Sequence, residues 1–153
     1  RVGRPDREGL MQGMEDEHCR SRDSEGTFAP VNRSNTPTTP SAEWGVVTDQ
    51  KKGWVVSDGI ARRVRVWGDV LQDAVSKRAG LVKEEVIALQ LYTGPMYGKY
   101  NAVLRGTPPE VVKALRGNTY ACTISCIVSG IKKLSQVMRL PTSRRLWVGV
   151  SAE

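Results

Sequence analysis

Apolar residues recur at helical spacing through the second half of the chain, and this periodicity constrains the fold more than any other feature. In the segment 118–138 they lie three and four residues apart, which places them on one face of a helix. They are Tyr120, Ile124, Ile127, Val128, Ile131, Leu134 and Met138. The segments 83–92 and 95–106 show similar spacing, and Thr93-Gly94-Pro95 separates them. The sequence therefore predicts a layer of helices, with Pro95 in the first turn of one of them.

Residues that begin and end helices stand at the boundaries of these segments. Gly80 is suited to end a helix in the left-handed conformation, and we predict one continuous helix over 60–80 before it. The apolar stripe of that helix is Ile60, Val64, Trp67, Leu71, Ala74 and Val75. Glu84 and Glu85 would lie in the first turn of the next helix, where its dipole favours acids. The run 107–110, TPPE, has the spacing of a capping box, with proline at the first helical position.

The N-terminal part has a different composition. We predict a short helix over 4–20, capped by Asp6, because its apolar stripe has helical spacing. That stripe is Leu10, Met14 and His18. Residues 21–40 are rich in Ser, Thr, Asn and Pro, which predicts an irregular arm with Phe28 and Val31 as its anchors. Two β-prone pieces follow, Trp44–Val47 and Trp54–Val56.

A single strand is predicted near the C-terminus, where residues 145–151 alternate between apolar and polar after Pro141. One strand cannot satisfy its own backbone hydrogen bonds, so we expect it to pair with strands outside these 153 residues. Because the chain begins at Arg1 and ends soon after this strand, we expect it to be part of a longer protein. The predicted class is α+β, seen here mainly as its helical N-terminal part. The predicted domains are 1–58 and 59–153.

The charge and cysteine content favour no special site. The chain carries 23 Lys and Arg against 16 Asp and Glu, but these are dispersed, and the main basic cluster is Arg62-Arg63-Val64-Arg65. We expect solvated surface there, with nucleic-acid binding as the open alternative. Cys122 and Cys126 lie four residues apart without a second pair of zinc ligands, which favours buried apolar cysteines. No apolar run approaches the roughly 18–20 residues that span a bilayer, so no membrane partner is predicted.

Two blocks of sequence carry a family resemblance. Residues 84–106 read EEVIALQLYTGPMYGKYNAVLRG, and residues 144–149 read RRLWVG. Together they resemble the arginine-specific mono-ADP-ribosyltransferases, a toxin-related group with an R-S-E signature. The resemblance implies NAD as the substrate, a protein arginine as the acceptor, and a cofactor-binding strand that contains Trp147 and Gly149. It implies that Tyr92, Tyr97, Tyr100, Asn101 and Arg105 brace the core, and we predict structural packing for all five.

The same resemblance predicts that this chain is inactive. Val148 stands where the family has an arginine that holds the NAD phosphates. Valine cannot replace it, because it lacks the charged guanidinium group that donates several hydrogen bonds to phosphate. The family's Ser-x-Ser strand and catalytic Glu-x-Glu turn do not follow the predicted strand, so no catalytic residue is assigned. Glu15, Asp16 and Glu17 are predicted to form a solvated face, and His18 to pack or to cap. The alternative function is a non-catalytic helical protein-interaction module or diverged relic.

Overall fold

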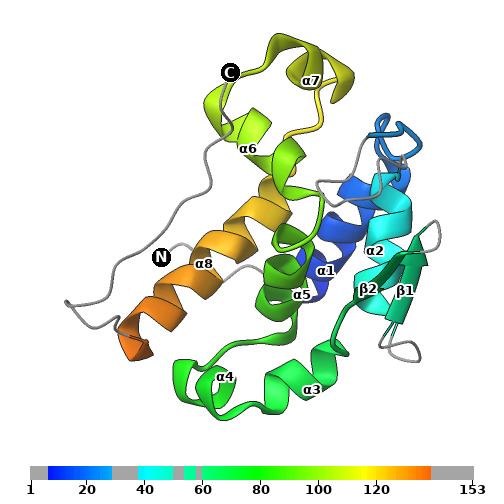
Figure 1. Cartoon of the computed structure of the whole chain (residues 1–153). Helices are drawn as coiled ribbons and strands as arrows, with labels where there is room; N and C mark the ends of the chain where they lie inside the picture. The colour runs from blue at the N-terminus through cyan, green and yellow to red at the C-terminus, as the bar shows by residue number, and fades with distance from the viewer. Residues whose placement is uncertain (1–6, 29–37, 50–53, 58–59, 139–153) are drawn as a thin grey trace, which may run out of the picture.

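Helices dominate the computed structural model, which describes residues 7–28, 38–49, 54–57 and 60–138 (Figure 1). The helices in chain order are α1 (Arg7–Glu15), the π-helical turn η1 (Asp16–Arg20), α2 (Pro40–Thr48), α3 (Trp67–Gln72), α4 (Ala74–Ala79), α5 (Lys83–Tyr92), α6 (Tyr97–Arg105), α7 (Pro109–Ala114) and α8 (Ala121–Val137). The mainly helical character that the periodicity predicts is therefore confirmed. The predicted strand at 145–151, like Asp6 and Val31, lies outside the described residues.

The longest helix, α8, packs against α1, α4 and α5. Two glycines allow the closest of these approaches. A Cβ atom at Gly13 of α1 would lie 2.6 Å from Cys122 Sγ, and one at Gly130 of α8 would lie 2.9 Å from Leu89 Cδ1 of α5. Because neither glycine has a side chain, the helix axes come nearer than larger residues would permit.

The hydrophobic core contains residues from both sides of the predicted domain boundary at residue 58. Its buried members are Met14, Trp44, Val47, Val64, Ile87, Ala88, Leu91, Met96, Tyr100, Leu115, Tyr120, Cys126 and Ile127. Phe28 packs against this cluster and forms a backbone bridge with Thr38, as expected of an anchor in the N-terminal arm. The boundary itself stays a prediction.

A two-stranded antiparallel hairpin agrees with the β-prone piece predicted at 54–56 and contradicts the helix predicted from residue 60. β1 (Trp54–Ser57) coincides with the predicted β-prone piece, and it pairs with β2 (Ile60–Arg63). The continuous helix predicted over 60–80 is wrong, because its first residues form β2. Helical structure begins only at α3, and the extended backbone of Asp73 separates α3 from α4. The pairing with β1 satisfies backbone groups that a helix would otherwise have bonded internally.

The piece Trp44–Val47 was interpreted as β-prone, and this interpretation is also wrong because it lies within α2. Thr39 caps this helix by accepting a hydrogen bond from the Ala42 amide, and Pro40 occupies its first turn. Trp44 and Val47 are three residues apart, so a helix turns both side chains into the core.

Most of the predicted helix boundaries agree with the structure. Gly80 ends α4 in the left-handed conformation, with φ 73° and ψ 33°. Pro109 occupies the first turn of α7, as predicted. Pro95 lies in the turn just before α6 and not, as predicted, in the first turn of the helix. The capping box at 107–110 does not form, because the N-cap residue is Pro108, whose side chain has no acceptor atom. No helix in the described ranges is both long and apolar enough to cross a bilayer.

Candidate functional site

The family-implied cofactor residues Trp147 and Gly149, with Val148 between them, lie outside the described residues. The bracing residues are described, Tyr92 at the end of α5 and the other four on α6. Tyr100 is fully buried, whereas Arg105 is exposed in the last turn of α6. The rings of Tyr92 and Tyr97 contact each other edge to face, with centroids 6.4 Å apart.

His18 is built into the core beside Tyr100. Its Nδ1 lies 2.7 Å from the Met14 carbonyl oxygen and its Nε2 lies 2.7 Å from Tyr100 Oη. Because a carbonyl can only accept, Nδ1 carries the proton and Nε2 accepts from the tyrosine hydroxyl. Burial lowers the pKa of His18 to about 4, so the ring is neutral at pH 7. The ring also stacks on Trp44, and the prediction that His18 packs is confirmed.

A second buried polar group centres on Asp23, whose side chain is inaccessible to solvent. Its oxygens accept hydrogen bonds from Ser21 Oγ at 2.6 Å, Asn118 Nδ2 at 2.8 Å and Tyr120 Oη at 2.8 Å. Lys99 Nζ lies 3.4 Å away. Burial alone raises the pKa of Asp23, but these hydrogen bonds and the lysine charge outweigh it and hold the pKa below its ordinary value. Asp23 is therefore an ionised and fully bonded anchor.

Glu17 caps α8 from a distant part of the chain. Its carboxylate accepts from the backbone amides of Cys122 and Thr123, each at 2.9 Å, and from the Thr123 hydroxyl at 2.8 Å. These amides are among those that a helix leaves unbonded at its N-terminus. The prediction of a solvated face is wrong for Glu17, whose pKa is raised because burial outweighs these hydrogen bonds. Asp16 agrees with the prediction, since it is exposed and pairs with Arg20.

Almost nothing in the sequence indicated the buried network around Asp23. Asn118 stands just before α8, and its position resembles that of a capping residue, which is the one local signal available. Asp23 lies in a polar arm and Lys99 in a helix, where both are usually solvated. No local pattern indicates that they meet.

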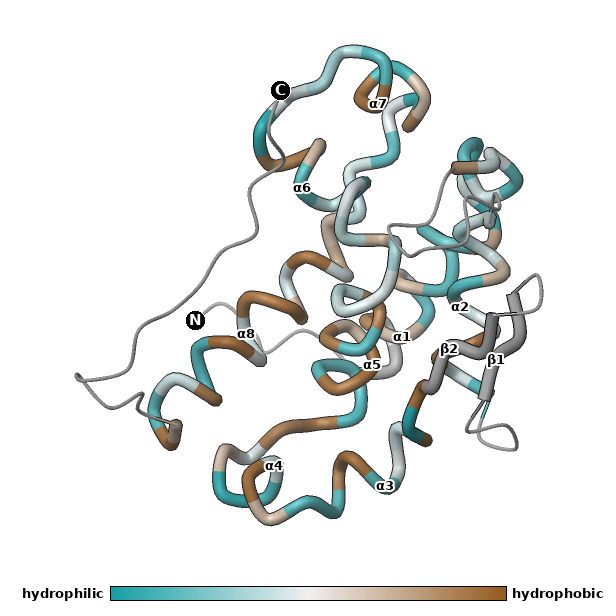
Figure 2. The backbone as a smooth tube through the Cα atoms, viewed as in Figure 1, coloured by the Kyte–Doolittle hydropathy of each residue, from teal (hydrophilic) through white to brown (hydrophobic). Residues whose placement is uncertain are grey.

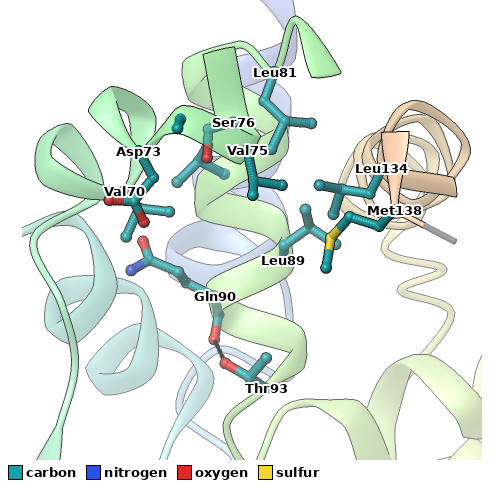
Figure 3. Close-up of a pocket in the computed structure, with 12 residues that line it drawn as sticks. Val70, Asp73, Val75, Ser76, Leu81, Leu89, Gln90, Thr93, Leu134 and Met138 are labelled. Carbon is teal, nitrogen blue, oxygen red and sulfur yellow. Dashed lines mark hydrogen bonds between the residues drawn. The ribbon is translucent and has the colours of Figure 1, made fainter. Parts of the chain in front are cut away.

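A groove offers space for a ligand between α3–α4, α5 and the end of α8 (Figure 3). Its volume is about 470 Å³, and its lining is largely apolar. Leu134 and Met138 project into it from α8, opposite Val75 and Leu89. Gln90 donates from Nε2 to the Arg65 carbonyl oxygen, while its buried Oε1 has no hydrogen-bond partner in the described structure.

An exposed apolar stripe continues from this groove along α8. Val128, Ile131 and Met138 are 44%, 50% and 55% exposed, although each has a large apolar side chain. Figure 2 shows hydrophobic positions recurring along the helix. Met138 belongs both to the stripe and to the lining of the groove, so the two features form one surface.

The cysteines and acids offer no metal or thiol chemistry in the described part of the chain. No group of three or more His, Cys, Asp or Glu residues there could hold a metal ion. All three cysteines are free. Burial raises the pKa of Cys126 to about 12, and it also raises the pKa values of Cys19 and Cys122. Their thiols are therefore protonated at pH 7 and weakly nucleophilic.

The chain matches no protein-family model, no curated protein and no solved structure. The resemblance to the ADP-ribosyltransferases therefore depends on residues 84–106 and 144–149 alone. The geometry adds a clear division of roles in the described residues. The buried networks of His18 and Asp23 are bonded internally and closed to substrates, whereas the groove and the α8 stripe are open to a partner.

Proposed function

We propose that this chain is the helical part of an NAD-dependent protein-arginine mono-ADP-ribosyltransferase, and that these 153 residues do not themselves turn over NAD. The reaction breaks the bond between ribose C1′ and the nicotinamide nitrogen. A guanidinium nitrogen of the acceptor protein forms the new bond to C1′ and loses a proton, and nicotinamide leaves. The resemblance of residues 84–106 and 144–149 supports this assignment.

The observation that carries the proposal is the packing of the block 84–106. Its two helices meet the core through different residues, α5 through Ile87, Ala88 and Leu91 and α6 through Tyr100, which His18 holds by a 2.7 Å hydrogen bond. A bracing role is what the resemblance implies for this block, since the family's chemistry takes place on the strands that follow it. The His18–Tyr100 pair fixes α6 against η1.

The expected lack of turnover has a physical basis in the sequence. Departure of nicotinamide builds positive charge on the ribose, which a fixed carboxylate must stabilise. The only acid after the predicted strand is Glu153, and it matches no Glu-x-Glu turn. Because position 148 is valine, the chain also lacks the guanidinium that would hold the pyrophosphate.

Replacing Val148→Arg tests the proposal, because it restores the missing phosphate contact. We expect the purified chain to give no NAD-dependent labelling of agmatine, and the variant to bind NAD at least about ten-fold more tightly. Isothermal titration with NAD measures the binding, and radiolabelled NAD measures the turnover.

Val150→Arg is the matched control, because it adds the same charge two residues away. Tighter NAD binding by both variants would show a general charge effect and count against the proposed site. Turnover by the unaltered chain would contradict the proposed inactivity.

A second candidate is a non-catalytic protein-interaction module. The exposed apolar stripe of α8 and the adjoining groove favour it, because monomeric proteins rarely leave contiguous apolar surface uncovered.

A further inference from the structure

The α8 surface, defined as Val128, Ile131, Leu134 and Met138, has the spacing of a helix-binding face. Val128, Ile131 and Leu134 recur every three residues, so their side chains follow one side of α8. Met138 follows directly, as the extended residue that ends the helix. Leu134 and Met138 turn toward the groove, where Val75 and Leu89 form the opposite wall (Figure 3). The surface is thus convex along α8 and concave at its C-terminal end. This shape fits a second helix whose apolar side chains project from one face.

Three exposed charges on and next to this surface are basic. Lys132 lies on α8 beside Ile131, and Lys77 and Arg78 follow the groove residue Ser76 in α4. Within the described ranges none of these three cations forms an ion pair. The acid that lines the groove, Asp73, is already bound by both guanidinium nitrogens of Arg65.

One charge pair between α8 and α5 is also balanced. Lys133 lies 2.8 Å from Glu85, whose side chain is only 5% exposed. In the described part of the chain, these three cations outnumber Asp69, the exposed acid beside the groove residue Val70. The charge around this surface is therefore positive on balance, and so is the net charge of the chain, +7. An occupant with acidic residues gains attraction there, whereas a second copy of this chain would bring the same cations against Lys132.

We propose that the α8 surface binds an amphipathic helix of a partner protein that carries acidic residues beside its apolar stripe. The proposal rests on the interaction-module candidate and specifies its partner. Apolar side chains of the bound helix contact Val128 and Ile131, and one of them enters the groove between Leu134 and Leu89. Its acidic residues face Lys132 and the end of α4.

A pair of synthetic peptides tests this proposal. Each is about 18 residues long, which matches the 17 residues of α8. Each carries leucine at helical i, i+3, i+4 and i+7 positions, with glutamate at the other positions in one peptide and lysine in the second. Fluorescence anisotropy of the labelled peptides, in roughly 0.1 M salt, measures binding to the full chain. We expect the glutamate peptide to bind at least about ten-fold more tightly than the lysine peptide.

Two variants locate the binding site. Ile131→Asp should weaken binding of the glutamate peptide by at least about ten-fold, because it places a charge in the apolar contact. Leu104→Asp is the matched control, since Leu104 is a 64% exposed apolar residue on α6, and it should leave binding unchanged. Circular dichroism checks that each variant is folded, and Val128→Asp replaces Ile131→Asp if the latter unfolds.

Several outcomes would overturn the proposal. These are absence of saturable binding by the glutamate peptide, equal affinity for both peptides, and full binding by the folded Ile131→Asp and Val128→Asp variants. A dimer in sedimentation velocity that Ile131→Asp abolishes would assign the surface to a second copy. Binding to anionic phosphatidylserine vesicles that Ile131→Asp abolishes would assign it to a membrane. The NAD titrations do not involve this surface, so failure here leaves the transferase proposal standing, and the reverse also holds.

Discussion

Asp23 and Lys99 form an ion pair deep inside the protein, where solvent cannot screen either charge. Their side chains are 0% and 7% exposed. Three hydrogen bonds to the carboxylate compensate for the loss of water around it. Such a pair adds little net stability when intact, but removal of one partner leaves the other charge buried alone.

Asp23→Ala should therefore reduce the free energy of unfolding by about 3–5 kcal/mol. The loss has two sources, the unpaired ammonium of Lys99 and the unbonded hydroxyl of Tyr120. Urea denaturation at pH 7 measures the change. Asp73→Ala removes an exposed carboxylate from its pair with Arg65 and should have a far smaller effect. Similar losses in both variants would show that burial of the Asp23 pair does not matter.

His18 makes the stability depend on pH in a defined window. Its folded pKa is about 4 and its ordinary value is 6.5, so between these values the unfolded chain binds more protons. Stability contributed by neutral His18 is thus complete above pH 6.5 and is lost as the pH falls toward 4. This shift in the pKa of His18 corresponds to about 3 kcal/mol of free energy of unfolding.

Replacing His18→Gln removes this titration and tests its source. The variant should lose less stability than the unaltered chain between pH 6.5 and 4, as measured by urea denaturation at several pH values. Glu17 acts in the opposite direction, because its raised pKa favours the folded state at acid pH, and the comparison cancels its contribution. Parallel stability curves for the two proteins would exclude His18 as the titrating group.

At the scale of elements, the contact between α1 and α8 depends on Gly13. Gly13→Ala should destabilise the fold by about 1–3 kcal/mol, because its methyl group would meet Cys122 Sγ at 2.6 Å. Thermal or urea unfolding measures the loss, which should largely disappear in a Cys122→Ala background. Gly45→Ala provides the control in α2, where a Cβ atom meets nothing within 4 Å. That substitution should stabilise by up to about 1 kcal/mol through helix propensity, and a loss there would contradict the packing explanation.

Elements were predictable where local signals agreed with one another. Helical spacing and a terminating glycine or proline indicated α5, α6 and α8, and Gly80 adopts the predicted left-handed conformation. The prediction for 44–47 failed because a short apolar run fits either a helix or a strand. The prediction for 60–63 failed because Ile60 fits the spacing of the helical stripe as well as it fits a strand. Thr39 and Pro40 decided the first case, and pairing with β1 decided the second.

At the scale of the whole molecule, the predicted features that failed most clearly were tertiary. Glu17 was expected in solvent because its neighbours in sequence are acids, yet it meets amides 105 and 106 positions away. Asp23 and Tyr120 are separated by 97 positions. Helical periodicity indicates which face of a helix is buried but not which distant segment buries it. The packing of Tyr100 was predictable from its place on that face, whereas its bond to His18 was not.

The capping of α8 by Glu17 has a consequence for the order in which the protein assembles. The carboxylate is synthesised about a hundred residues before its partners Cys122 and Thr123. Closing so long a loop costs entropy and slows folding. Glu17 can therefore cap α8 only after this long loop has closed. Proteolytic cleavage between Glu17 and Asp23 would allow Glu17 to leave the first turn of α8. The amides of Cys122 and Thr123 would then lose their hydrogen-bond acceptor, about a hundred residues from the cleavage site.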